Sequence, residues 1–154
     1  MKTLIVMRHG HAENWAATDF ARCLTADGLT AVGAAAAILR SLALRPDLIL
    51  SSSAARALQT AERVAAALGI PNDRIMAERS LYHMDDDTLL REIRHTGDEF
   101  DTLMMVGHNP AVSALASGLT DEMYGMRPAG FAVLTDGGDS WGTFGERISS
   151  ARYF

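Results

Sequence analysis

The hydrophobic pattern of the chain contains three short apolar runs, at residues 4–7, 48–50 and 102–106. Within these runs apolar residues follow one another without polar alternation. Continuous runs of this length are typical of strands buried on both faces, as in a parallel sheet. The pattern therefore predicts three parallel strands, each followed by polar residues.

Two segments between these runs place apolar residues at helical spacing. The first segment forms a single stripe, made of Leu29, Val32, Ala36, Leu39 and Ala43. Thr25 is suited to cap the start of this helix. The second predicted helix spans residues 54–68, and Gly69 followed by Pro71 is a usual end signal.

Weaker signals predict three further elements. Residues 74–78 favour an additional strand, and Asp85 begins an acidic run that suits the first turn of a helix. After the third apolar run, Asn109 is suited to the N-cap of a short helix and Pro110 to its first position. The alternation of strands and helices then continues as far as residue 119.

The C-terminal part of the chain carries a hairpin signal. A strand at residues 131–134 is followed by a turn at 136–139 and by Trp141, Thr143 and Phe144. In a regular strand Trp141 and Phe144 fall on opposite faces, so at least one of them is expected to be exposed.

Alternating strands and helices predict an α/β fold of three layers, α/β/α. We expect a mostly parallel central sheet with an antiparallel C-terminal edge hairpin. The length suits one domain over residues 1–154. In such sheets, ligands bind beyond the carboxyl ends of the strands.

Composition narrows the class of protein. Hydrophobic residues make up 48% and charged residues 21%, which excludes disorder and coiled coil. The net charge of −5 argues against nucleic-acid partners and against a basic membrane surface. One cysteine, Cys23, excludes an internal disulfide. With no long apolar segment and no signal-peptide pattern, we expect a cytoplasmic protein that does not enter membranes.

The predicted strand ends bring chemically useful residues to one edge. Arg8 and His9 follow the first strand, Arg56 lies in the first turn after the second, and His108 follows the third. Two guanidinium groups suit the oxygens of a phosphate, and histidine is an established covalent nucleophile. A nucleophilic His9 needs one unprotonated nitrogen, and a backbone acceptor on the other nitrogen would fix that tautomer.

The motifs at these positions resemble those of the histidine phosphatase superfamily. They are Arg8-His9-Gly10, the serine-led segment at 51–61 with Arg56-Ala57-Leu58-Gln59-Thr60, and Gly107-His108-Asn109-Pro110. Asp19, Arg22, Leu24, Thr25 and Gly28 match a further pattern, which is similar to that of the compact SixA-type phosphohistidine phosphatases. The resemblance implies a fold like that of the phosphoglycerate mutases.

The resemblance also implies roles for individual residues. His9 would be the nucleophile, while Arg8, Arg56 and His108 would hold the phosphate oxygens. Arg22 and Asp19 would lie near the pocket mouth. The substrate-binding group would also include Gly10 and Asn109, which adjoin the two histidines. No cofactor is implied.

The segment between Arg56 and His108 leaves little room for a lid. An open pocket suits a phosphate displayed on a protein, such as phosphohistidine on a histidine phosphotransfer domain of a phosphorelay. Larger family members carry a glutamate acid after the third strand, where this chain has Leu81-Tyr82-His83-Met84. The proton donor stays open among five residues, namely His83, Asp85, Asp19, His11 and Glu78.

Three other interpretations of these residues are possible. The first is a phosphomonoesterase for a small phosphate ester such as a sugar phosphate or nucleotide. The second is a non-catalytic module that binds phosphoproteins, although such a module would not need His9. The third is a metal site at His9 and His11, which the charges of Arg8 and Arg56 disfavour, so no metal is expected.

Overall fold

The computed structural model describes residues 1–154 and contains one six-stranded sheet, with strand order β3-β2-β4-β1-β5-β6. Its strands are β1 (Lys2–Arg8), β2 (Leu48–Ser52), β3 (Ile75–Glu78), β4 (Thr102–Gly107), β5 (Phe131–Asp136) and β6 (Ile148–Tyr153). The pairs β3–β2, β2–β4 and β4–β1 are parallel, while β5 and β6 run antiparallel at one edge. The mixed sheet expected from the sequence is confirmed.

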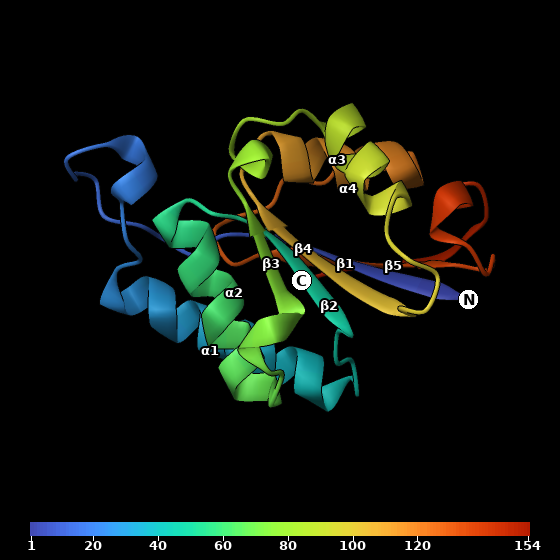
Figure 1. Ribbon diagram of the computed structural model, residues 1–154, viewed down its shortest axis with the longest axis horizontal. Coiled ribbons are helices and arrows are strands. Elements are labelled where there is room, and N and C mark those ends of the chain that lie inside the picture. Colours follow the sequence, from blue (N-terminus) through green and yellow to red (C-terminus); the bar gives the residue numbers. More distant parts are fainter.

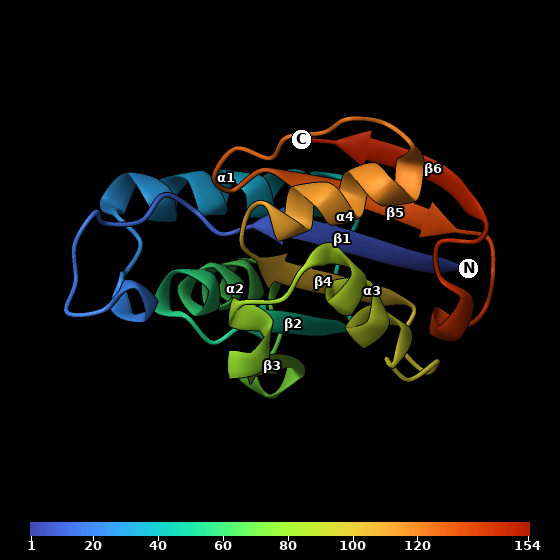
Figure 2. The same ribbon diagram turned by 90° about the horizontal axis from the view of Figure 1, so that it is seen from above.

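Helices cover both faces of this sheet (Figures 1 and 2). They are α1 (Ala26–Ser41), α2 (Ala55–Leu68), α3 (Asp86–Arg94) and α4 (Ala111–Thr120). In Figure 1, α3 and α4 lie above the sheet and α1 and α2 below it, which confirms the three layers. None of the four has both the length and the apolar content needed to cross a bilayer.

The apolar runs are continuous because each strand contributes to two cores. Ile5 and Met7 of β1 belong to the core under α1 and α2, whereas Leu4 and Val6 belong to the core under α3 and α4. Successive side chains of a strand point to opposite faces, so a strand between two helical layers must be apolar at every position.

The helix ends largely follow the sequence signals. Thr25 caps α1 by accepting a hydrogen bond from the Gly28 amide at 3.0 Å. Asp85 caps α3 in the same way, by accepting a hydrogen bond from the Thr88 amide at 2.8 Å. Gly69 ends α2 in the left-handed region, at φ 67°. That conformation costs glycine little because it has no Cβ.

The predicted start of α4 is wrong by one residue. Pro110 is the N-cap and makes no side-chain capping bond, so the helix begins at Ala111. Asn109 is engaged elsewhere, because its Nδ2 donates to the Met126 carbonyl at 2.9 Å and its Oδ1 accepts from the Ser113 hydroxyl. The amide side chain therefore fastens the segment before β5 instead of capping the helix.

The predicted stripe of α1 is wrong at both ends. Leu29 is 41% exposed, and Ala43 lies beyond the helix with φ 55°. The buried face is instead centred on Val32, Ala36 and Leu39.

The second strand of the C-terminal hairpin lies later than predicted. Residues 141–144 do not form a strand; Trp141–Thr143 is a 3₁₀ turn, and β6 starts at Ile148. Trp141 and Phe144 are both fully buried and their rings stack at 5.1 Å, so the prediction of an exposed ring is wrong. A turn of three residues, unlike a strand, directs both rings to the same core.

Buried polar groups hold this turn in place. The Asp136 carboxylate accepts hydrogen bonds from the amides of Gly138, Gly145 and Arg147, which shapes the whole connection between β5 and β6. The Trp141 indole donates to the Phe100 carbonyl at 2.7 Å.

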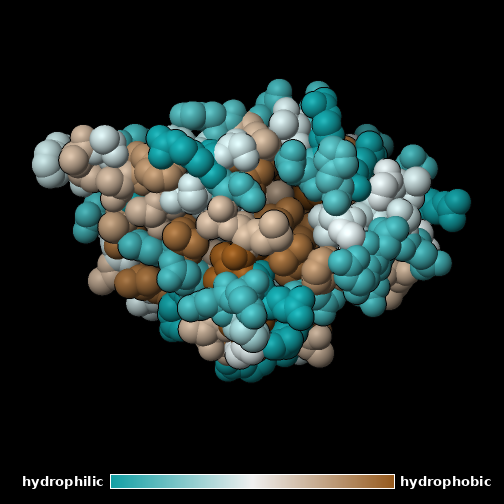
Figure 3. All heavy atoms as spheres, viewed as in Figure 1, coloured by the Kyte–Doolittle hydropathy of each residue, from teal (hydrophilic) through white to brown (hydrophobic).

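The connection between β1 and α1 forms an arm, defined here as residues 10–24. It projects from the carboxyl end of the sheet, beyond α1 and α2 (Figures 1 and 2). In Figure 3 the visible face of the arm is largely tan and white, the colours of residues with moderately apolar or intermediate hydropathy. An isolated antiparallel β-bridge between Ala12 and Leu24 joins the two sides of the arm at its base.

The two tryptophans of the chain allow a matched test of these positions. We expect Trp141→Ala to lower the free energy of unfolding by about 3–5 kcal/mol, because it leaves a cavity in the core. Trp15→Ala, at a side chain 79% exposed, should change it by less than about 0.5 kcal/mol. Urea unfolding followed by circular dichroism measures both, and equal losses would contradict the burial of Trp141.

Candidate active site

Two histidines meet where β1 and β4 end. The parallel register pairs Arg8 with Gly107, so His9 and His108 leave the sheet side by side. Their ring centroids are 5.2 Å apart, with an angle of 56° between the planes. The predicted convergence of the strand ends is therefore observed.

Arg56 joins this pair from the first turn of α2. It is only 7% exposed, and its Nε lies 3.3 Å from Nε2 of His9, to which it donates. The other ring nitrogen of His9, Nδ1, lies 2.7 Å from the Gly10 carbonyl, which is an acceptor only. Nδ1 therefore carries the proton, and the lone pair of Nε2 faces the cluster, as the sequence analysis expected.

Arg8 and His108 complete the polar cluster. Arg8 Nη1 donates to the Met126 carbonyl at 3.0 Å, and His108 Nε2 lies 2.9 Å from the Ser52 hydroxyl. Arg8 Nε and His108 Nδ1 are buried and have no hydrogen-bond partner. Buried polar atoms are seldom left unpaired in folded proteins, and functional sites are among the places where they occur.

Threonine and glycine hold the loop after β1 against α2. The Thr60 hydroxyl donates to the Arg56 carbonyl at 2.7 Å and accepts from the Gly10 amide at 3.1 Å. A Cβ on Gly10 would lie 2.8 Å from Val32 and 3.1 Å from the Gly28 carbonyl, so a larger residue has no room. Gly10 thus acts through its backbone in this arrangement.

Asp19, on the arm, reaches the same cluster. Its Oδ2 accepts from Arg56 Nη2 at 3.0 Å, its Oδ1 accepts from Arg22 Nη1 at 2.9 Å, and the Tyr82 hydroxyl also donates to Oδ2. Its backbone carbonyl accepts from Arg56 Nη1 at 2.8 Å. The structure therefore brings Asp19 and Arg22 to the edge of the His9–Arg56 cluster.

Asn109 is placed differently from Asp19 and Arg22. Its Nδ2 and Arg8 Nη1 donate to the same Met126 carbonyl oxygen, so both side chains fasten the segment before β5. Both functional groups of the Asn109 amide are engaged in this way.

The sequence pattern did not single out Tyr82. Its ring centroid lies 5.4 Å from that of His108, 5.1 Å from Phe20 and 4.0 Å from His83, and the Arg56 guanidinium lies 5.8 Å away. The signal that could have pointed to Tyr82 lies in the segment at 81–84. At the place where larger family members carry a glutamate, this segment has a tyrosine hydroxyl. Tyr82 connects the loop after β3 to the arm.

The structure disfavours two of the five candidate proton donors. The hydrogen bonds from Tyr82 and Arg22 hold the pKa of Asp19 far below its usual range, so this carboxylate stays ionised. The pKa of Asp85 is also lowered, because its side chain caps α3 through Thr88. Of the other three, His83 packs against Tyr82, with ring centroids 4.0 Å apart, and Tyr82 in turn contacts His108.

Burial and positive charge keep both central histidines neutral. Burial, together with the charge of Arg56, lowers the pKa of His9 to about 4. Burial also lowers the pKa of His108 to about 3, with His9 and Arg56 acting in the same direction. At neutral pH the cluster therefore combines two neutral imidazoles with two guanidinium cations.

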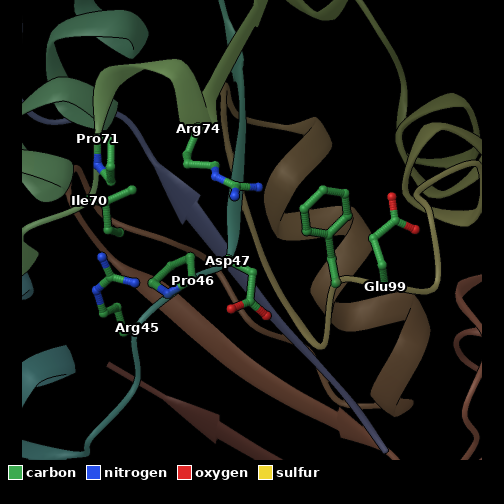
Figure 4. Close-up of a pocket in the computed structure, with 8 residues that line it drawn as sticks. Arg45, Pro46, Asp47, Ile70, Pro71, Arg74 and Glu99 are labelled. Atoms are coloured by element: carbon green, nitrogen blue, oxygen red, sulfur yellow. The ribbon is translucent and has the colours of Figure 1, made fainter.

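A pocket of about 420 Å³ lies at the opposite, amino end of the parallel strands (Figure 4). It is formed beside the starts of β2, β3 and β4, and Arg45, Asp47, Arg74 and Glu99 line it. Arg45 already donates to the Leu68 and Gly69 carbonyls. This pocket carries no histidine and is separate from the His9 cluster.

Comparison with known proteins identifies the family. Residues 4–102 match the model of the histidine phosphatase superfamily, branch 1. The chain belongs to this superfamily. The match covers β1 to the start of β4 and so includes Arg8, His9 and Arg56.

Solved structures similar to this superfamily member include two SixA proteins. A protein of Nakamurella multipartitia described as a phosphohistidine phosphatase SixA has a TM-score of 0.83 at 29% identity, covering 98% of this chain and 95% of its own. The protein histidine phosphatase SixA complexed with tungstate has a TM-score of 0.79 at 25% identity, covering 87% and 88%. The likeness to the SixA-type branch thus extends over nearly the whole chain.

An uncharacterised protein of Mycobacterium tuberculosis is 40% identical over 98 residues. The match covers 64% of this chain and 59% of that protein. The chain therefore spans about three fifths of the length of the mycobacterial relatives it matches.

The lowered histidine pKa values predict a specific pH dependence. We expect both rings to stay neutral at about pH 6, where an ordinary histidine is largely protonated. The unfolded chain then binds more protons than the folded chain, so stability is complete above about pH 6.5 and falls as the pH drops towards 4. Ring ¹⁵N shifts measured between about pH 3 and 8 check this, and titration of either ring near pH 6.5 would contradict it.

Proposed function

We propose that this protein is a metal-independent phosphatase that removes phosphoryl groups from phosphohistidine on a protein through a phosphoenzyme at His9. The observation that carries the proposal is the state of His9. Its Nδ1 proton is held by the Gly10 carbonyl, which leaves the lone pair of Nε2 facing Arg56. A group that only binds phosphate has no need of a nucleophile prepared in this way.

The reaction has two steps. In the first, Nε2 of His9 attacks phosphorus in line and the bond from phosphorus to the substrate nitrogen breaks. The leaving imidazole, protonated beforehand on its other nitrogen, keeps that electron pair and departs as the neutral ring. In the second, water attacks the phosphoryl group on His9, inorganic phosphate leaves, and neutral His9 is restored. Arg8 and Arg56 neutralise the charge on the transferring oxygens, and His108 adds a hydrogen bond.

The charges around His9 favour this route without a metal ion. Arg8, Arg22 and Arg56 all lie at or beside the cluster, and together they would repel a cation. The same guanidinium groups supply the positive charge that phosphoryl transfer requires.

Two features favour phosphohistidine over an alkyl phosphate ester. The Asp19 carboxylate stays ionised between its arginines and does not serve as a proton donor. A phosphohistidine substrate reduces the need for such a donor, because its imidazole leaves readily once the ring is protonated. The likeness to SixA structures supports the same substrate class.

The first experiment measures phosphate release from a histidine phosphotransfer domain phosphorylated on histidine, in excess EDTA. We expect His9→Ala to lower the rate by at least about 1,000-fold, because the covalent route is lost. His95→Ala is the matched control, since His95 is an exposed histidine at the end of α3 and should keep the wild-type rate.

A label chase completes this test. Brief mixing with ³²P-labelled substrate should leave acid-labile label on the wild type and none on His9→Ala. Turnover without His9 would refute the mechanism, and binding without turnover or label would indicate a phosphoprotein-binding module. Release from sugar phosphates or nucleotides alone would indicate a small-molecule phosphomonoesterase.

A second variant tests the geometry of Arg56. Its Nε, Nη1 and Nη2 each make a separate hydrogen bond, which a lysine ammonium cannot reproduce. We expect Arg56→Lys to lower kcat/KM by about 100-fold although the charge is kept. Arg63→Lys, elsewhere on α2, should have no effect, and equal rates for the two variants would show that charge alone is needed.

A further inference from the structure

The tip of the arm exposes an aromatic side chain close to the proposed active site. Trp15 is 79% exposed, and the neighbouring residues at 14–18 carry no charge. Trp15 precedes Asp19 by four residues, so the two lie at most about 14 Å apart along the chain. Asp19 is itself hydrogen-bonded to Arg56 of the His9 cluster, so the tip belongs to a segment that reaches this cluster.

The arm is held in this position from its base. The Glu13 amide donates to the Cys23 carbonyl at 2.9 Å, and Arg22 Nε donates to the Glu13 carbonyl at 2.6 Å. These bonds and the bridge between Ala12 and Leu24 tie the two sides of the arm together. The Trp15 side chain therefore extends from a loop whose two sides are hydrogen-bonded to each other.

A second attachment joins the arm to the loop after β3. Phe20 packs edge-on against Tyr82 at 5.1 Å, and the Arg79 guanidinium lies 4.2 Å from the Phe20 ring. Asp19 adds its hydrogen bonds to Tyr82 and Arg56. The arm is therefore attached to the body of the protein through Phe20 and Asp19 as well as at its base.

We infer that the arm tip, with Trp15 as its anchor, is the docking surface for the protein that carries the phosphorylated histidine. This inference rests on the proposed function and specifies how the substrate is recognised. The partner is a folded domain that presents an apolar patch beside its phosphohistidine. Tryptophan is enriched among the residues that dominate binding in protein interfaces, and an uncharged tip suits an apolar patch.

The position of Trp15 separates protein substrates from small ones. We expect a free phosphohistidine molecule to be held by the cluster around His9 and to need no contact with Trp15. A domain that brings the same phosphoryl group to His9 is large enough to contact the arm as well. Trp15 is therefore expected to affect one substrate class and leave the other unchanged.

The test compares Trp15→Ala with the wild type on two substrates, free phosphohistidine and the phosphorylated phosphotransfer domain. We expect kcat/KM for the domain to fall about tenfold or more, chiefly through KM, because a central interface anchor is lost. Turnover of free phosphohistidine should stay within about twofold. Met123→Ala is the matched control, since Met123 is 99% exposed and lies beyond the end of α4.

An equal loss on both substrates, or no loss on the domain, would overturn the docking role. Binding can also be followed without turnover, by adding the phosphorylated domain to His9→Ala. Burial of the exposed indole should shift tryptophan fluorescence to the blue, and an unchanged spectrum would overturn the inference. Failure of the wild type to act on either substrate would instead refute the proposed function, and the fluorescence titration would still decide the docking role.

Discussion

Parallel pairing of β4 with both β1 and β2 is the constraint on which the site depends. The register sets Arg8 opposite Gly107 and Ser51 opposite Val106, so three strand ends reach one edge at the same level. Residues far apart in the sequence become neighbours without any long loop having to carry them. The two cores on either face of the sheet hold this register, because sliding a strand by one residue would exchange its two faces.

Arg56 connects the remaining parts of the site. Its three donor nitrogens hold His9 and the arm, and its carbonyl accepts from Thr60, which also binds the loop after β1. A change in any one of these groups removes hydrogen-bond partners from the others, and buried polar groups are costly to leave unpaired. Helix α2, the strand end and the arm thus form one hydrogen-bonded unit around His9.

The sequence predicted the parts of the structure that depend on short-range patterns. Continuous apolar runs located β1, β2 and β4, and the residues after them located His9, Arg56 and His108. The position of Tyr82 in the site could not be predicted from the sequence. It depends on contacts with Phe20 and His108, which only the folded chain brings near. The turn at Trp141 was mistaken for a strand because the Asp136 carboxylate, through three distant amides, determines its shape.

Asp19 has a further consequence for the end of the proposed reaction cycle. Its carboxylate neutralises part of the positive charge that Arg22 and Arg56 present. An anion entering the site therefore competes with a carboxylate that is already bound there, and it is held less tightly than the two arginines would hold it without Asp19. In the proposed cycle, inorganic phosphate leaves arginines that keep Asp19 as a partner, so release of the product does not leave their charges unpaired.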